Sequence, residues 1–246
     1  LIEGIASASP YIPRFDNMGN FKLYTIKETY NVFDVINDQD GGSENHKIHE
    51  HDLIDFSFSR TKIEQIYTKV VFNYNYDYTR GIFNKSVAIG IEDIIGSDVY
   101  DYDYYGLKHP IFEDGVWTHP ESTLIIDDDR GKYIRDDTTA GEFAEWILMW
   151  SINQHIKMKL KLPLKHLNLE IGDIIEFDSV LGKVKPYGID YTDLSVNLNG
   201  STNQYNKFMI MSTNKTLEFV DIECIQMHNL TSVFIVWGCM DNTGEN

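Results

Sequence analysis

The chain has 246 residues, of which 42% are hydrophobic, and its formal net charge is −17. This length and hydrophobic content allow one large or two small domains with real cores. The acidic balance disfavours general nucleic-acid binding, because affinity for the phosphate backbone depends on lysine and arginine. No stretch approaches the roughly 18 uninterrupted apolar residues of a membrane-spanning helix, and no secretory signal is visible at the N-terminus.

Cysteine content and the first residue give two further expectations. Cys224 and Cys239 are too few for a disulfide framework or a zinc-binding set. The chain opens with Leu1 and not with methionine, so we expect it to be a processed or trimmed part of a longer protein.

The N-terminal region predicts short strands at residues 21–26 and 30–36, followed by a polar, glycine-containing loop. A histidine cluster, His46, His49 and His51, comes next. Imidazoles at this density can bind zinc, but the H-x-x-H-x-H spacing lacks the i, i+4 helical pattern of metallohydrolases. We therefore expect neither a metal nor another cofactor, and the three histidines stay as weak metal-ligand candidates.

From Ile66 onward, apolar and polar residues alternate over more than ten positions, which predicts a long β-strand. Its even positions include Tyr74, Tyr76 and Tyr78. Such a row could stack on sugars or bases, or it could pack on a neighbouring sheet or subunit. The second interpretation is favoured.

The segment between residues 90 and 137 is acidic and rich in loops, and none of it matches a calcium-binding loop. Its last part, residues 125–131, predicts a strand that ends in a polar turn. Composition then changes from acidic loop to apolar helix. We therefore predict two domains: residues 1–137, β-rich with acidic loops, and residues 138–246, a helix followed by an antiparallel β-module.

An amphipathic helix is predicted at about residues 139–154. Thr139 and Glu142 fit a capping box at its start. Its buried face is predicted by four large apolar residues at helical spacing: Phe143, Trp146, Ile147 and Trp150.

After the helix, residues 155–162 alternate between cationic and apolar, which predicts a half-buried strand. Gly172 and Asp173 then form a tight turn before a second strand at residues 174–177. Further strands are expected at residues 208–212, 217–226 and 232–237, with a hairpin at Asn214–Lys215.

These elements predict an α+β, β-rich fold, with antiparallel sheets or small β-barrels and one amphipathic helix. The sequence contains no nucleophile elbow, P-loop or dinucleotide-binding fingerprint. Each acidic residue of the helix and of the Gly-Asp turn has a sufficient structural reason. The chain is therefore predicted not to be an enzyme.

Three segments carry a resemblance to a known family: Trp146–Trp150, then Ile156–Leu160, then Leu169–Phe177. In this order they resemble tail tip and baseplate hub proteins of tailed bacteriophages. Upstream, Ser59–Glu64 and Tyr67–Tyr74 resemble the domain that precedes this part in the family. The resemblance extends from about residue 55 to residue 180.

The resemblance implies a structural virion protein whose β-barrel domains form a ring, usually a trimer. Such a ring joins the tail tube to the tip and surrounds the path of the DNA, which passes without specific binding. The implied partners are copies of the chain itself and other tail proteins (tube, distal tail, spike or fibre), assembled in the host cytoplasm into the virion. The residues expected in structural or interface roles are Tyr74, Tyr76, Tyr78, Trp146, Trp150, Gly172 and Asp173.

Two other classes stay open. One is a carbohydrate-binding or receptor-binding module that uses Tyr74, Tyr76, Tyr78 and Trp117 as stacking surfaces. The other is a metal-dependent hydrolase built on the histidine cluster.

Overall fold

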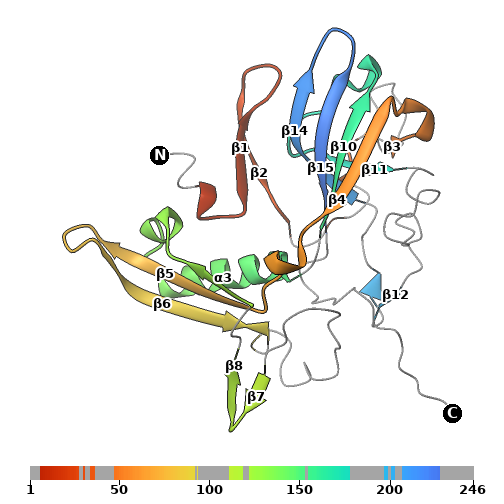
Figure 1. Ribbon diagram of the computed structural model, residues 1–246. Helices are drawn as coiled ribbons and strands as arrows, with labels where there is room; N and C mark the ends of the chain where they lie inside the picture. Colours follow the sequence, from red (N-terminus) through yellow and green to blue (C-terminus); the bar gives the residue numbers. More distant parts are fainter. Residues whose placement is uncertain are drawn as a thin grey trace, which may run out of the picture. The chain divides into compact units, whose positions relative to one another are not determined.

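The computed structural model describes residues 6–27, 30, 34–36, 47–91, 93, 111–118, 122–152, 155–177, 197–198, 201–202 and 207–227 (Figure 1). Contacts divide the chain into two compact units, of which unit 1 is residues 1–11, 62–154 and 230–246. Unit 2 is residues 12–61 and 155–229. Strands predominate in the described part, so the predicted α+β, β-rich class is confirmed. Within these residues, no helix is long and apolar enough to cross a membrane.

In the described part of unit 1, three strands form a sheet in the order β6–β5–β9. Strand β5 (Lys69–Asp77) is antiparallel to β6 (Ile82–Gly90) and parallel to β9 (Thr123–Ile126). Helix α3 (Asp137–Ser151) packs on β5 and β6, and the 3-10 turn η5 (Asp129–Lys132) packs on β5. A small hairpin joins β7 (Ile111–Glu113) to β8 (Val116–Thr118), and η3 (Ile63–Gln65) precedes β5.

Strand β5 has the two-residue alternation that the sequence predicts. Val70, Phe72 and Tyr74 are buried, whereas the residues between them are only partly buried. Val87 and Ile89 of β6 lie opposite Phe72 and Val70 in the antiparallel register. Residues directly opposite one another share a face of the sheet. Strands β5 and β6 therefore present one apolar face to the helix.

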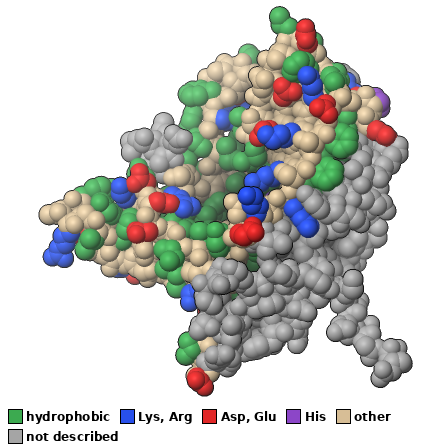
Figure 2. Space-filling view, viewed as in Figure 1, with side chains coloured by type: hydrophobic (Ala, Val, Ile, Leu, Met, Phe, Trp, Pro, Cys, Tyr) green, Lys and Arg blue, Asp and Glu red, His purple; other side chains and the backbone are tan. Residues whose placement is uncertain are grey.

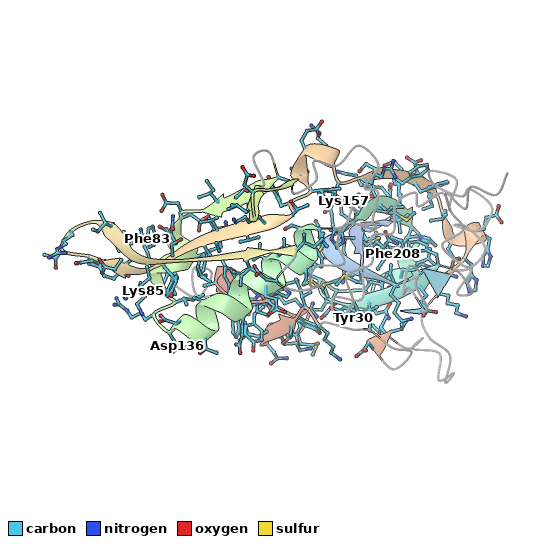
Figure 3. All side chains as sticks on the ribbon, turned by 90° about the horizontal axis from the view of Figure 1, so that it is seen from below. Tyr30, Phe83, Lys85, Asp136, Lys157 and Phe208 are labelled. Atoms are coloured by element: carbon cyan, nitrogen blue, oxygen red, sulfur yellow. The ribbon has the colours of Figure 1, made fainter. Side chains whose placement is uncertain are left out.

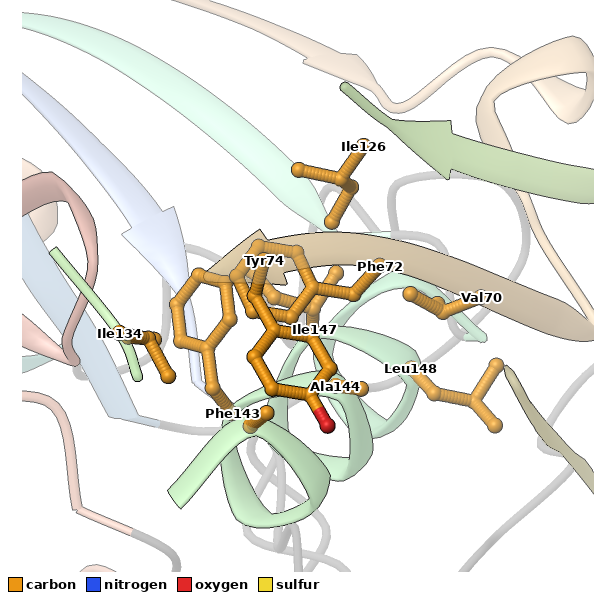
Figure 4. Packing of buried hydrophobic residues seen from close by; sticks show 10 residues of the cluster. Val70, Phe72, Tyr74, Ile126, Ile134, Phe143, Ala144, Ile147 and Leu148 are labelled. Carbon is orange, nitrogen blue, oxygen red and sulfur yellow. The ribbon is translucent and has the colours of Figure 1, made fainter. Parts of the chain in front are cut away.

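The core of unit 1 forms where this face meets α3 (Figure 4). Phe72 and Phe143 lie with their ring centroids 4.9 Å apart. Ala140 and Ala144 are fully buried, and their small side chains let the helix approach the sheet closely. Ile126 of β9 and Ile134 complete the cluster, together with Val70, Tyr74, Ile147 and Leu148.

The helix begins two residues earlier than the sequence predicts, and its N-cap is Asp136. The Asp136 carboxylate accepts the Thr139 backbone N–H at 3.0 Å and the Thr139 hydroxyl at 3.2 Å. The predicted capping box at Thr139 is therefore wrong. Aspartate is as good a cap as threonine, and the pattern of apolar residues does not distinguish the two starts. The helix ends at Ser151, and Asn153 and Gln154 lie outside the described residues.

The buried face of α3 also differs from the predicted one. Phe143 and Ile147 are buried as expected, but Trp146 and Trp150 are only partly buried. Alanines at 140 and 144 and Leu148 take the central positions instead. The spacing of the large side chains misplaced the face by part of a turn, because it ignored the alanines that fit closest to the sheet.

Replacement of Asp136 by alanine is expected to lower the melting temperature of the protein more than replacement of Thr139. The Asp136 side chain accepts two hydrogen bonds at the helix start, whereas the Thr139 side chain donates one of them. Circular dichroism melting curves of the two variants test this. A larger loss for Thr139→Ala would restore Thr139 as the cap.

In the described part of unit 2, six strands form one curled sheet in the order β3–β11–β14–β15–β10–β4. Neighbouring strands are antiparallel except for β3 and β11, which are parallel. Their bounds are β3 Lys47–Ile48, β4 Asp55–Arg60, β10 Ile156–Leu162, β11 Ile174–Phe177, β14 Lys207–Lys215 and β15 Val220–Gln226. Two further pairs are β1 (Tyr11–Phe15) with β2 (Phe21–Thr25), and β12 (Asn197–Leu198) with β13 (Ser201–Thr202). The 3-10 turns η2 (Glu50–Asp52) and η6 (Leu164–His166) precede β4 and follow β10.

Strands β10 and β11 confirm two of the sequence predictions. Ile156, Met158 and Leu160 of β10 are buried, whereas Lys157 and Lys159 are exposed. All four residues of β11 are buried. Its glutamate, Glu176, is paired at 3.2 Å with Lys207 of β14, which is also buried. A buried charge needs such a partner.

The C-terminal strand predictions hold only in part. Strands β14 and β15 are present, but their turn lies at Thr216–Phe219 and not at the predicted Asn214–Lys215. Thr216 makes this turn by exchanging hydrogen bonds with Phe219. The predicted strand at 232–237 lies outside the described residues. Of residues 30–36, Val35 forms an isolated parallel bridge with Ile174.

The two units do not divide the chain at residue 137, where the sequence predicts a boundary. Helix α3 packs on β5 and β6, which precede it, and so shares unit 1 with them. Strand β10 lies between β4 and β15, so unit 2 takes strands from both halves of the chain. The change in composition at 136–138 marks the start of a helix and not a change of unit.

Candidate functional site

The β1–β2 hairpin of unit 2 ends in a tight turn built around Asp16. Its carboxylate accepts the backbone N–H groups of Met18 and Asn20 at 2.9 and 2.8 Å. Gly19 has φ +81°, which glycine adopts without strain. The N–H of Asn20 and the neighbouring Lys22 ammonium hold the pKa of Asp16 well below its usual range. The turn is therefore rigidly specified by its own sequence.

One face of this hairpin is anchored through Arg14 to the loop that precedes β11. The Arg14 guanidinium is buried, lies 2.7 Å from Glu170 and donates to the Tyr24 hydroxyl at 2.6 Å. The second oxygen of Glu170 accepts the Asn17 N–H at 2.8 Å. One carboxylate thus holds both the strand and the turn of the hairpin.

Gly172 is in direct contact with the hairpin. Its φ is +87°. It lies in a turn closed by a hydrogen bond from the Asp173 N–H to the Glu170 carbonyl, at 3.2 Å. This is the conformation of glycine in a type II turn. A Cβ added at Gly172 would lie 2.7 Å from Cγ of Tyr24, so the ring rests directly on the glycine. Both the backbone conformation and the contact require glycine here.

Asp173 lies on the buried side of the same turn. Its carboxylate accepts the Glu170 N–H at 2.8 Å and lies 3.9 Å from the Arg14 guanidinium. Burial raises the pKa of Asp173 despite these contacts. Burial also lowers the pKa of Lys215, whose ammonium donates to the Asn17 side chain at 3.1 Å.

Replacement of Asp173 by asparagine is expected to reduce the pH dependence of unfolding. The pKa of Asp173 in the folded protein is above its ordinary value of about 3.9. Between these two pKa values, Asp173 therefore binds more protons in the native state than in the unfolded state. The native state is therefore stabilised at low pH, and this contribution is lost as pH rises through the folded pKa. Urea unfolding from pH 4 upward tests this, with Asp114→Asn, at an exposed turn, as control. An unchanged slope for Asp173→Asn would contradict the assignment.

The opposite face of the hairpin is apolar and exposed. The exposed fractions are 71% for Phe15, 84% for Met18, 45% for Phe21 and 54% for Leu23. The rings of Phe15 and Phe21 meet edge to face, with centroids 5.5 Å apart. Figure 2 shows hydrophobic side chains at the surface over this hairpin. We call Phe15, Met18, Phe21 and Leu23 the arm face.

The predicted tyrosine row does not form one exposed stacking surface. Tyr74 is 4% exposed, and its hydroxyl donates to Asp137 at 3.0 Å. Tyr76 packs edge to face on Phe83 at 5.0 Å, and Tyr78 is 66% exposed. Figure 3 shows the reason. Strands β5 and β6 extend past the start of the helix near Asp136, so the helix covers the beginning of the tyrosine row and not its end. Trp117 lies in β8, apart from this row.

The two tryptophans of α3 lie at the border of the core. Trp146 and Trp150 stack with ring centroids 6.4 Å apart. Trp146 also packs on the core cluster, but its indole N–H is buried with no hydrogen-bond partner among the described residues. The structural role expected for both residues stays a prediction.

The histidine cluster is part of a charged contact between η2 and η6. The rings of His49 and His51 stack 5.2 Å apart. Asp52 is buried and paired with Lys165 at 2.5 Å and His166 at 3.3 Å. Burial opposes ionisation of Asp52, but the Lys165 ammonium, together with His166 and the His49 backbone, outweighs it and keeps the pKa below its ordinary value.

His46 lies outside the described residues. Within them, no three histidine, cysteine, aspartate or glutamate side chains are grouped so that they could hold a metal ion.

Sequence reasoning missed Arg14, Tyr24 and Glu170 as partners of the Gly172 turn. Arg14 and Glu170 are 156 positions apart, and no periodicity connects them. The available signal was the pair Phe15 and Phe21 flanking Asp-Asn-Met-Gly-Asn, which is typical of a hairpin with aromatic strands.

No protein-family model matches the chain, and no curated protein matches it. Solved structures do. A chain of the virion of the native gene transfer agent particle has a TM-score of 0.48 and 11% identity, covering 94% of this chain and 39% of that one. The 43 kDa tail protein of prophage MuSo2 from Shewanella oneidensis has a TM-score of 0.41 and 8% identity, covering 91% and 52%. The tail protein from Neisseria meningitidis MC58 has a TM-score of 0.43 and 6% identity, covering 90% and 52%.

The chain thus spans between 39% and 52% of the length of these three chains. Each TM-score is below 0.5, so these similarities carry no conclusion about function. These three solved structures are tail and virion proteins.

Proposed function

We propose that the chain is a structural, non-catalytic component of a phage tail tip or baseplate hub. In this role copies of the chain form a ring that connects the tail tube to the tip and surrounds the DNA path. Its other partners are the tube, the distal tail protein and a spike or fibre. It is assembled into the virion in the host cytoplasm.

The observation that carries this proposal is the anchored hairpin with its exposed arm face. Arg14, Glu170 and Gly172 fix the hairpin, and its opposite face presents four large apolar side chains to solvent. An apolar surface held on a rigid support is typical of proteins that assemble with other proteins.

One of the segments that resemble the hub family, Leu169–Phe177, also supports the proposal, because it holds the same hairpin in place. Strand β10 lies inside the sheet of unit 2, and the Gly172 turn that follows it contacts the ring of Tyr24. The Gly-Asp turn of the family-like segment thus coincides with the support of the candidate interface.

The acidic charge is compatible with a ring around DNA. At a net charge of −17, the chain repels phosphate, so that DNA would pass without adhering. Fluorescence anisotropy with labelled duplex DNA is expected to show no saturable binding at physiological salt. Saturable binding would contradict this part of the proposal.

Electron microscopy tests the proposed role. Gold-labelled antibody against the chain is expected to mark one end of the tail, and the purified chain is expected to form rings of three or six copies. A stable monomer that neither marks tails nor binds tail components would overturn the proposal.

A further inference from the structure

We infer that the arm face packs against the arm face of a second copy of this chain. This deepens the proposed function, on which it rests: a face-to-face contact is two-fold and joins copies in pairs, so it fits a ring of six built from three pairs and not a ring of three. The observations that carry it are the area of the face and its rigid support.

The exposed area fits contact between two copies. A side chain of this size has about 150 to 250 Å² to bury, so the exposed fractions of Phe15, Met18, Phe21 and Leu23 leave about 500 Å² in water. That is near the upper end of the largest patch on a typical monomer. Two such faces packed together would remove about 1,000 Å² from water, which is where specific interfaces begin.

The support of the face lowers the cost of docking. Asp16 fixes the turn, and Glu170 holds both Arg14 and the Asn17 N–H. Tyr24 rests on Gly172. A hairpin already held in place loses little further freedom when it binds, so more of the gain from apolar burial remains as affinity.

Charge does not oppose a second copy as the occupant. The chain carries −17, so most approaches between two copies bring like charges together. Residues 11–27 are an exception, with Arg14, Lys22 and Lys27 against Asp16. Asp16 is itself paired with Lys22 at 3.0 Å, and its side chain is 6% exposed. At the arm face, two acidic copies can therefore meet without placing hairpin carboxylates against each other.

Cysteine cross-linking tests the geometry. Met18→Cys, 84% exposed at the hairpin turn, is expected to give cross-linked dimers with a short bismaleimide, in the full chain with Cys239 replaced by serine. Cys224 is buried and stays in place. Val116→Cys, 61% exposed on β8, is the matched control and is expected to give none. Failure of Met18→Cys to cross-link under conditions where the chain self-associates would overturn the inference.

Sedimentation velocity tests the energetics. The double variant Phe15→Ser/Phe21→Ser is expected to weaken self-association at least about tenfold, because buried aromatic anchors dominate interface affinity. Ile125→Ser, which removes a 65% exposed side chain from β9, is expected to leave it unchanged. Circular dichroism checks that both variants fold.

The outcomes separate this inference from the proposed function. Unchanged association of the double variant overturns the arm face but leaves a ring possible through another surface. A wild-type chain that stays monomeric yet marks tails overturns the inference alone, and another tail protein is then the occupant. Arm-dependent association of a chain that does not mark tails supports the inference and overturns the proposed function.

Discussion

Replacement of Gly172 by alanine is expected to destabilise the protein by about 2 to 5 kcal/mol. A left-handed backbone at a non-glycine residue costs about 1 to 3 kcal/mol, and forced overpacking adds a similar amount. Both apply here, because Gly172 has φ +87° and its added Cβ would lie 2.7 Å from Cγ of Tyr24. Urea unfolding of the full chain measures the loss.

Gly141→Ala is the matched control for this experiment. Gly141 lies inside α3 with a right-handed backbone and no atom within 4 Å of an added Cβ. Alanine in a helix interior is favoured over glycine by about 0.5 to 1 kcal/mol. The control is therefore expected to gain stability. Equal effects of the two substitutions would show that Gly172 does not support the hairpin through Tyr24.

Replacement of Phe143 by alanine is expected to cost about 3 to 5 kcal/mol, the usual range for a phenylalanine removed from a core. Phe143 is 5% exposed and packs against Phe72 at 4.9 Å between ring centroids. Its loss opens a cavity between the helix and the sheet that alanines at 140 and 144 cannot fill. Thermal and urea unfolding measure the effect.

Trp146→Ala is expected to cost clearly less, about 1 to 2 kcal/mol, although tryptophan is the larger residue. Part of its ring is already in water, and its buried indole N–H has no partner among the described residues to lose. Comparing the stability losses of the two variants shows which face of the helix packs on the sheet. A larger loss for Trp146 than for Phe143 would mean that α3 faces the sheet as the sequence alone predicts.

Local periodicity was enough to predict several strands of this protein. The alternation of Val70, Phe72 and Tyr74 places β5, and that of Ile156, Met158 and Leu160 places β10. In both strands the pattern is strict because one side is buried and the other is not. The Gly-Asp turn before β11 was likewise visible, since glycine has few uses that do not involve backbone conformation.

The candidate site was much less predictable than these strands. Gly172 and Asp173 were expected to be structural, but the arm face was not recognised as a surface. The exposure of Phe15 or Phe21 depends on which side of the hairpin Arg14 binds to the loop before β11. That choice is made by Glu170, far along the chain, and no pattern within the hairpin encodes it.

The sequence by itself determined strands β5 and β10, the Gly-Asp turn before β11 and the acidic charge, because these follow from local backbone preference and composition. Only the tertiary structure decided which face of α3 is buried, which aspartate caps it and how the strands divide between two units. It also decided that the Gly172 turn carries a hairpin. Each of these depends on contacts between residues distant in the chain, whose free energies exceed the small local preferences that a sequence pattern reports.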